Sequence, residues 1–386
     1  MRRRLALRTV AALAAAGLVA LSQAAPGDAG TATFDGTVVR YVAASGEANH
    51  VLAQMGDVCF PYTDLGACGP AVLLRERGAA PLLAGQGCRP LASQWVICPI
   101  GAAWQPGANE EQLVHLLLAD DDDSADTTLA CASEDVLPIC AALVDGGDGN
   151  DTLRGAKAGV ALDRLAGGVG RDNLRGGYEL EGGPGADTLR GYFDVDREDV
   201  SRAVYRDRRA RVFVTLNGRR DDGERGENDL VIDVAGVEGG ANADVLVGNR
   251  RSNIFYGGRG RDVIRTRGGT DRAYGDDFRS LVRPFCHPRI GGADRLYGGA
   301  GRDRLRGCAG ADLVNGGPGP DYMDGQRGSD FITGGRGRDR LHGSVGSDTL
   351  LARDGGLDWV FGGRGRDRGR IDRGVDARRS IERLLR

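Results

Sequence analysis

Apolar side chains recur with a period of nine residues through much of the second half of the chain. In the clearest stretch an apolar residue stands two positions after each aspartate, in the order Leu296, Leu305, Val314, Met323, Ile332, Leu341 and Leu350. Because strand side chains alternate between two faces, this pattern predicts a three-residue strand whose middle side chain points inward. The glycines that precede each aspartate predict a tight turn between one strand and the next.

Two such nonapeptides make one coil of turn, strand, turn and strand, and stacked coils make a parallel β-roll. In this stack each residue lies beside the residue 18 positions later, at the strand spacing of roughly 4.8 Å. The same register holds from Asp244 to Asp271 and, with irregular spacing, around Asp151. We therefore predict an all-β fold, a parallel β-roll or β-solenoid of glycine-rich nonapeptides with a disulfide-stapled N-terminal β region.

The extent of the repeat predicts how the chain is organised. The expected segments are a signal peptide at 1–25, a disulfide-bonded β cap at 26–144, first β-roll repeats at 145–191, a non-repeat β linker at 192–238, and a main array at 239–386 with a loop insert at 277–290. The cap is expected because the open first coil of a solenoid needs a cover. Its β-prone runs predict strands at Thr37–Ala43, Val72–Leu74, Trp95–Ile97 and Val114–Leu118.

The first 25 residues have the pattern of a secretory signal peptide. Arginines at positions 2, 3, 4 and 8 precede an apolar run from Val10 to Leu21, and small residues then offer cleavage after Ala24 or Ala25. A membrane anchor is the alternative, but this apolar run is too short to span a bilayer. We expect an extracellular protein without a membrane span.

The eight cysteines fit an oxidising compartment. Six of them form near-local pairs, for which local bridging is the simplest of several connectivities: Cys59/Cys68, Cys88/Cys98 and Cys131/Cys140. Zinc binding is the alternative, but the sequence has no Cys-x-x-Cys motif. Cys286 and Cys308 stand at turns on the same edge, one coil apart, so we also expect a bridge between them.

The stacked aspartates predict a metal site. A column of carboxylates and turn carbonyls at the strand spacing repels itself when it is empty. The same column offers only oxygen donors, which are the ligands that Ca²⁺ prefers. Calcium held between consecutive turns would stabilise the folded roll by mass action.

The repeat also resembles a known family. Stretches such as Gly298-Gly-Ala-Gly-Arg-Asp303 and Gly316-Gly-Pro-Gly-Pro-Asp321 are similar to the nonapeptide of the RTX (repeats-in-toxin, hemolysin-type) secreted calcium-binding β-roll proteins. The resemblance covers roughly residues 145–191 and 236–376. It implies that calcium is the cofactor. The ligands would be the aspartate at position six of each nonapeptide, counted from its first glycine as position one, and carbonyls of the turn glycines.

The resemblance implies metal ligands only where the motif stands. These are the aspartates Asp151, Asp172, Asp187, Asp244, Asp262, Asp294, Asp303, Asp312, Asp321, Asp330, Asp339, Asp348 and Asp367, with the glycines Gly299, Gly301, Gly317, Gly319, Gly335 and Gly337. Asn253 replaces an aspartate and predicts a weaker half-site. Leu357 stands where the spacing calls for an acid, with Asp358 one position late. Turn arginines, for example Arg336 and Arg338, are expected to pair with aspartates in the metal-free chain.

Motifs for enzymatic chemistry are missing from the sequence. The four histidines are scattered without His-Glu-x-x-His, and there is no Gly-x-Ser-x-Gly elbow. His115 is interpreted as a half-buried strand residue, and the acidic run Asp120–Asp123 as a solvated loop, with cation binding as the alternative. We expect a protein that is not an enzyme, while an unrecognised site within 26–144 remains the alternative.

Charge and surface pattern bear on the partners. The formal net charge is −3, which gives no support to a nucleic-acid partner. Calcium ions are the expected partner, and the expected function is that of a secreted structural or surface module. The alternative is a module that binds polyanions or glycans, such as cell-surface or matrix polymers, through exposed rows that contain Arg304, Tyr322 and Arg340, with calcium purely structural.

Overall fold

The computed structural model describes residues 31–34, 39–43, 50–59, 68–76, 83–84, 86, 88–92, 95–99, 114–118, 121–129, 142–156, 163–192, 201–276, 286, 291–372 and 375–385. The predicted signal peptide lies outside these residues. Every regular element in the described part is a strand, and no helix there could cross a membrane. Between residues 192 and 202 the chain divides into two compact units.

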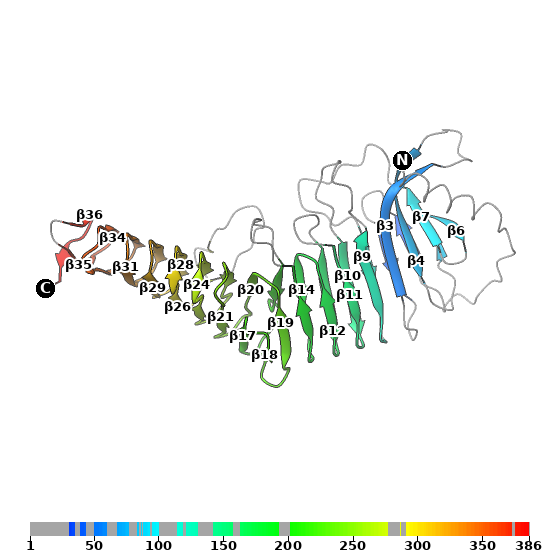
Figure 1. Ribbon diagram of the computed structural model, residues 1–386, viewed down its shortest axis with the longest axis horizontal. Helices are drawn as coiled ribbons and strands as arrows, with labels where there is room; N and C mark the ends of the chain where they lie inside the picture. The colour runs from blue at the N-terminus through cyan, green and yellow to red at the C-terminus, as the bar shows by residue number, and fades with distance from the viewer. Residues whose placement is uncertain are drawn as a thin grey trace. The chain divides into compact units, whose positions relative to one another are not determined.

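The C-terminal unit is a two-sheet parallel roll (Figure 1). Its sheet I contains β16 (Arg202–Val204), β20 (Gly236–Glu238), β22 (Ile254–Tyr256), β25 (Arg272–Tyr274), β28 (Arg304–Ala309), β30 (Tyr322–Arg327), β32 (Arg340–Val345), β34 (Trp359–Arg364) and β36 (Ala377–Arg379). Its sheet II contains β17 (Val212–Thr215), β21 (Val245–Val247), β23 (Val263–Arg265), β26 (Arg295–Tyr297), β29 (Leu313–Pro318), β31 (Phe331–Arg336), β33 (Thr349–Ala352), β35 (Arg368–Ile371) and β37 (Arg383–Leu384). Short strands β24 (Gly268–Gly269) and β27 (Ala300–Gly301) pair with each other at the turns.

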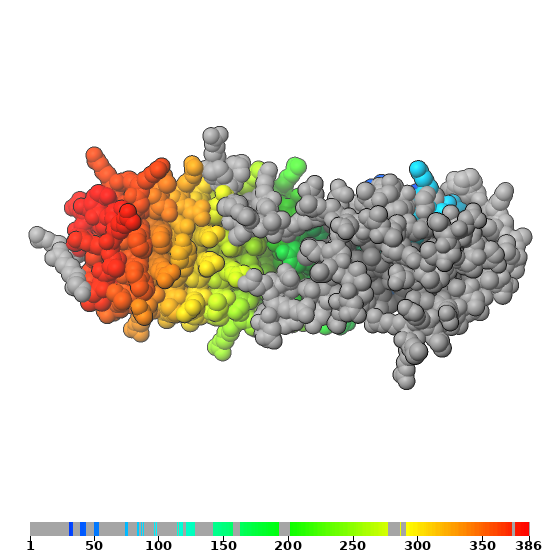
Figure 2. Space-filling view, turned by 90° about the horizontal axis from the view of Figure 1, so that it is seen from above, coloured from blue at the N-terminus to red at the C-terminus, as the bar shows by residue number. Residues whose placement is uncertain are grey.

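Strands of successive coils pair in parallel at the predicted step of 18 residues. In sheet I, Arg304 lies opposite Tyr322, and in sheet II, Leu313 lies opposite Phe331. Figure 2 shows the coils of this unit as successive bands of colour. The predicted β-roll is therefore confirmed.

One apolar side chain from each strand fills the narrow interior of the roll. The predicted inward residues, from Leu296 to Leu350, are all completely buried, as is Val360 in the next coil. Their neighbours within each strand point outward, so β28 alternates between exposed Arg304, buried Leu305 and half-buried Arg306. The nine-residue apolar pattern thus locates the core correctly.

The N-terminal unit also consists of two sheets, whose strands pair in parallel around the first repeats and include antiparallel pairs among the earlier strands. One sheet contains β1 (Thr31–Phe34), β2 (Val39–Val42), β5 (Leu83–Ala84), β8 (Val114–Leu117), β10 (Ala142–Asp148), β12 (Arg164–Val169) and β14 (Glu179–Glu181). The other contains β3 (His50–Cys59), β4 (Cys68–Glu76), β6 (Arg89–Ala92), β7 (Trp95–Pro99), β9 (Ser124–Leu129), β11 (Thr152–Arg154), β13 (Asn173–Arg175) and β15 (Thr188–Arg190). The four strands expected in this region correspond to β2, β4, β7 and β8.

Parallel pairing begins before the first recognisable repeat. Strand β8 pairs in parallel with β10, and β9 pairs in parallel with β11. The expected boundary at residue 145 therefore falls inside β10. In the same way β16 and β17, from the expected linker 192–238, take places in sheets I and II, and an antiparallel extension follows in β18 (Arg220–Glu224) and β19 (Asp229–Ile232).

Two expected disulfides are present. Cys88 bridges to Cys98, and Cys286 bridges to Cys308 across a Cα–Cα distance of 5.2 Å. Cys59 and Cys68 are opposite each other in the register of β3 and β4. The pair Cys131/Cys140 and most of the insert 277–290 lie outside the described residues.

Candidate metal centre

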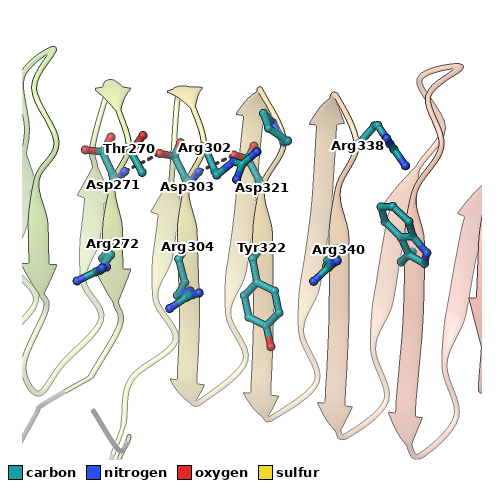
Figure 3. Close-up of a pocket in the computed structure, with 12 residues that line it drawn as sticks. Thr270, Asp271, Arg272, Arg302, Asp303, Arg304, Asp321, Tyr322, Arg338 and Arg340 are labelled. Carbon is teal, nitrogen blue, oxygen red and sulfur yellow. Dashed lines mark hydrogen bonds between the residues drawn. The ribbon is translucent and has the colours of Figure 1, made fainter. Parts of the chain in front are cut away.

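Position-six aspartates form two columns in the C-terminal unit, one along each turn edge. In each column the backbone N–H of one aspartate donates to the Oδ1 of the aspartate in the next coil, as from Asp303 to Asp321 and from Asp294 to Asp312, both at 2.8 Å. Figure 3 shows this arrangement for Asp271, Asp303 and Asp321. Each carboxylate is thereby held in one orientation by the coil before it.

The first column precedes the strands of sheet I, and the second precedes those of sheet II. The first contains Asn253, Asp271, Asp303, Asp321, Asp339, Asp358 and Asp376. The second contains Asp244, Asp262, Asp294, Asp312, Asp330, Asp348 and Asp367. A shorter column in the N-terminal unit contains Asp123, Asp151, Asp172 and Asp187.

The second carboxylate oxygen of most of these residues is buried and has no hydrogen-bond partner. Among the described residues this is true of Oδ2 in Asp151, Asp172, Asp262, Asp271, Asp294, Asp303, Asp312, Asp321, Asp330, Asp339, Asp348, Asp358 and Asp367. Each of these side chains is 0–2% exposed. A buried, unpaired carboxylate oxygen is costly, so a repeated row of them calls for a missing positive partner.

In most of these repeats Oδ2 turns back toward the glycine that begins the repeat. A Cβ atom at Gly298 would lie 2.6 Å from Oδ2 of Asp303 and 2.6 Å from the carbonyl oxygen of Gly316 in the next coil. At Gly316 the corresponding distances are 2.5 Å to Asp321 and 2.6 Å to the carbonyl of Gly334. The absence of a side chain at position one therefore leaves room where a carboxylate and a carbonyl oxygen converge.

Carbonyls of the other predicted glycines also stack from coil to coil. A Cβ atom at Gly319 would lie 1.6 Å from the carbonyl oxygen of Gly301, and one at Gly337 would lie 2.0 Å from that of Gly319. The position-two glycines Gly299, Gly317 and Gly335 repeat this relation along the same edge. On the other edge, position two is occupied by Cys308, Gln326 and Ser344 with positive φ between 69° and 81°.

Burial and mutual repulsion raise the pKa of the column carboxyls. Desolvation raises the pKa of Asp294 to about 9, and the charges of Asp262 and Asp312 add to this shift. The pKa of Asp330 rises to about 8 and that of Asp321 to about 7, again mainly through burial and then through neighbouring aspartates. The raised pKa values mean that protons and a bound cation would compete for these carboxylates near neutral pH.

The donors present suit a hard divalent cation. Carboxylate and carbonyl oxygens are the ligands that calcium takes, usually six to eight of them. No group of three or more His, Cys, Asp or Glu side chains that could hold a metal occurs among the described residues. A metal in these columns must therefore draw a large part of its coordination from main-chain carbonyls, and the stacked turns provide them.

Two members at the start of the columns have their oxygens already satisfied, as does Asp376 at the end, which accepts N–H bonds from Asp358 at Oδ1 and from Asp372 at Oδ2. Asp244, an expected ligand, accepts N–H bonds from Val212 at Oδ1 and from Gly240 at Oδ2. The Oδ1 of Asn253 accepts the N–H of Asn249. These positions, at the start of the C-terminal unit's columns, are the least suited to a cation.

Column aspartates that were not among the expected ligands include Asp123, Asp271 and Asp358. The backbone N–H of Asp271 donates to Asp303, which follows it by 32 positions because the insert lies between them. Asp358 accepts the N–H of Asp339 across 19 positions, so the extra residue is absorbed in the turn before it. Asp123, expected in a solvated loop, is 2% exposed and donates its N–H to Asp151. In each case the sequence contained a signal for column membership, because a small or apolar inward residue stands two positions after the aspartate.

The expected pairing of turn arginines with column aspartates is wrong for the described residues. None of Arg336, Arg338 or their counterparts at 259, 261, 364 and 366 forms an ion pair with a position-six aspartate. The aspartates are buried and bonded to the backbone, whereas these arginines extend into solvent, Arg338 over the ring of Trp359 at 5.2 Å.

The histidines do not assemble into a site. His342 lies on the outer face of sheet I, with its ring centroid 4.8 Å from that of Phe361, and Nδ1 of His50 lies 2.6 Å from Oγ of Ser124 in the other unit. His115 is in β8, as expected for a strand residue.

A comparison with known protein families identifies the same repeat. A family model described as the RTX calcium-binding nonapeptide repeat (four copies) matches residues 143–157, 179–197, 238–278, 290–323 and 315–350. A search of curated proteins finds no match.

Proposed function

This chain is an RTX-type repeat protein in the segments that carry the nonapeptide, and from that premise we propose that it is a secreted, non-enzymatic calcium-binding protein. The observation that supports this function is the set of buried Oδ2 atoms without partners, repeated coil after coil beside stacked carbonyls. Calcium between consecutive turns would supply the positive charge that these oxygens lack.

The residues that would hold calcium are the thirteen aspartates with an unpaired Oδ2, together with carbonyls of turn glycines such as Gly301 and Gly319. The backbone N–H bonds to Oδ1 orient each carboxylate before a cation arrives. The glycines keep side chains out of the space between coils. Asp187 and Asp244 remain expected ligands, the second of them weaker because both of its oxygens accept N–H bonds.

A structural or surface role outside the cell is the form of this function that we favour. The two disulfides fit an oxidising environment, and the calcium-loaded roll would be a rigid stack of coils. Calcium would then be structural for any second function on the outer faces of the sheets, where arginine and tyrosine rows fit an acidic polymer.

The test is a thermal melt of the full chain, with disulfides intact, followed by circular dichroism in calcium, in magnesium and in chelator. We expect calcium to raise the melting temperature strongly and magnesium to raise it little, because magnesium demands tighter octahedral geometry. Identical curves in calcium and chelator would contradict the proposal. Calorimetric titration would count the sites that fill.

A further inference from the structure

The outer face of sheet I carries a groove lined by arginines and aromatic rings. Along the first outward row, neighbouring strands present Arg272, Arg304, Tyr322, Arg340 and Trp359 opposite one another in register. Figure 3 shows the labelled members of this row on successive strands, below the aspartates of the first column. The groove therefore runs across the strands, along the direction in which the coils stack.

From Arg304 onward, arginine and aromatic side chains alternate in this row and contact each other. The guanidinium of Arg304 lies 5.8 Å from the ring centroid of Tyr322, and that of Arg340 lies 5.3 Å from the ring of Trp359. Arg302 and Arg338 extend over the same groove from the turns. Contacts of this kind hold the guanidinium groups in place and leave their N–H donors for a ligand.

The groove is positively charged at its surface. Its acidic residues, Asp271, Asp303 and Asp321, are only 1–2% exposed and point into the column. The exposed charges are the arginines, and in the described part of the chain Arg302, Arg304, Arg338 and Arg340 form no ion pair with a carboxylate. Such a row is complementary to a line of anionic groups.

We propose that this groove binds an acidic polysaccharide lying along the stacking direction of the coils. Arg304 and Arg340 stand two coils apart, roughly 10 Å at the strand spacing. A polymer that presents one carboxylate or sulfate at about that interval would meet an arginine at each, with sugar rings packed against Tyr322 and Trp359.

A nucleic acid fits the groove less well. Its phosphates are much denser, with about one charge per 1.7 Å of duplex. The chain as a whole carries a net charge of −3, and the resulting repulsion grows with the charge density of the polymer, so it opposes a nucleic acid more strongly than a sparsely charged polysaccharide.

The experiment measures binding of the full chain, saturated with calcium, to hyaluronan, with neutral dextran and single-stranded DNA as comparison probes. We expect hyaluronan to bind and the double variant Arg304→Gln/Arg340→Gln to lose about tenfold or more in affinity. The matched control is Arg295→Gln/Arg368→Gln, which removes the same charge from exposed positions of sheet II. The control variant should bind within about twofold of the parent chain.

A third variant, Trp359→Ala, should also weaken binding if the sugar rings pack on the aromatic residues. Equal losses in the groove and control variants, tighter binding to DNA than to hyaluronan, or no binding to hyaluronan would each overturn the proposal. Circular dichroism of every variant in calcium checks that the roll is intact. Calcium dependence of the fold is measured separately, so either proposal can fail while the other stands.

Discussion

At the scale of single residues, the two oxygens of a column aspartate have different tasks. In Asp321, Oδ1 accepts the N–H of Asp303 at 2.8 Å, whereas Oδ2 is buried without a partner. The first oxygen therefore stabilises the stack of coils in any state. The second is costly in the metal-free protein and becomes useful only when a cation is present.

Replacement of one such residue should therefore have opposite effects with and without calcium. In calcium, Asp321→Asn should lower the melting temperature by roughly 2–4 °C, as for a loss of about 1 kcal/mol, because a charged ligand is gone. In chelator at slightly alkaline pH the same variant should be equally or more stable, because an amide is less costly to bury than a carboxylate. Paired melts of parent and variant check both signs.

Asp207→Asn is the matched control, since Asp207 is exposed and outside the columns. It should leave both melting temperatures nearly unchanged. If Asp321→Asn lowered stability equally in calcium and in chelator, Oδ2 would have no role in metal binding.

Two glycines with positive φ but different surroundings provide a second comparison. Gly319 has φ of 138° and would place a Cβ atom 1.6 Å from the carbonyl of Gly301. Gly319→Ala should cost at least about 3 kcal/mol, since two coils must separate. Gly355, in the turn that absorbs the extra residue, has φ of 90° and nothing within 4 Å of a Cβ atom.

Gly355→Ala should accordingly cost only about 1–2 kcal/mol of backbone strain. Denaturant unfolding in calcium measures both changes. Equal costs would show that the contact between stacked carbonyls does not limit which residues fit at position four.

The sequence could predict which aspartates stack only where spacing was regular. From Asp294 to Asp348 the nine-residue step identified each column member correctly. At Asp358 and Asp271 the spacing is broken by an extra residue or an insert, while the hydrogen bonds simply continue across 19 or 32 positions. Hydrogen bonding between coils, rather than distance along the chain, decides membership, and no sequence count reveals that directly.

At the scale of elements, each column acts as a row of coupled acids. The pKa of Asp321, Asp330 and Asp294 is raised to about 7, 8 and 9, chiefly by burial, from 3.8 in the unfolded chain. Between these values the folded state binds protons that the unfolded state does not. Stability from this source is complete below about pH 4 and is lost as pH rises through about 7 to 9.

The metal-free protein should therefore melt at a higher temperature near pH 5 than near pH 8.5. Calcium should remove most of this difference by stabilising the charged columns at the higher pH. Melts across that range in chelator and in calcium provide the measurement. A metal-free protein that is more stable at the alkaline end would contradict the raised pKa values.

Strands without the repeat also join the sheets. Arg202 in β16 pairs with Gly236, and Phe213 in β17 pairs with Val245, although residues 192–238 show no nine-residue period. The buried Tyr205, just after β16, donates its hydroxyl to Oδ2 of Asp229 at the start of β19, at 3.0 Å. Contacts of this kind do not repeat along the sequence. The sequence therefore predicted β structure in this segment but not the places of its strands in the two sheets.

At the scale of the whole molecule, the column aspartates are distributed unevenly between the two units. Among the described residues, the C-terminal unit has two columns with thirteen aspartates between them, and the N-terminal unit has one column of four. Linked stabilisation grows with the number of sites that bind only the folded state. Calcium should therefore protect the C-terminal unit more.

Hydrogen exchange followed by mass spectrometry can resolve this difference. Peptides from 291–372 should gain more protection on calcium addition than peptides from 163–192. Both segments are measured in one sample, so each serves as the reference for the other. Equal gains would mean that the columns of the two units bind with the same total free energy.

The stack of coils also restricts how the chain can be lengthened. Successive nonapeptides alternate between sheet I and sheet II, so an added nonapeptide would transfer every later strand to the opposite sheet. Arg340 would then no longer lie in line with Arg304, and the row of arginines would be broken. An added pair of nonapeptides leaves both rows intact, and an insertion such as 277–290 does too, because β23 still pairs with β26. A gene that lengthens this protein by duplication while keeping its outer surfaces must therefore do so in whole coils.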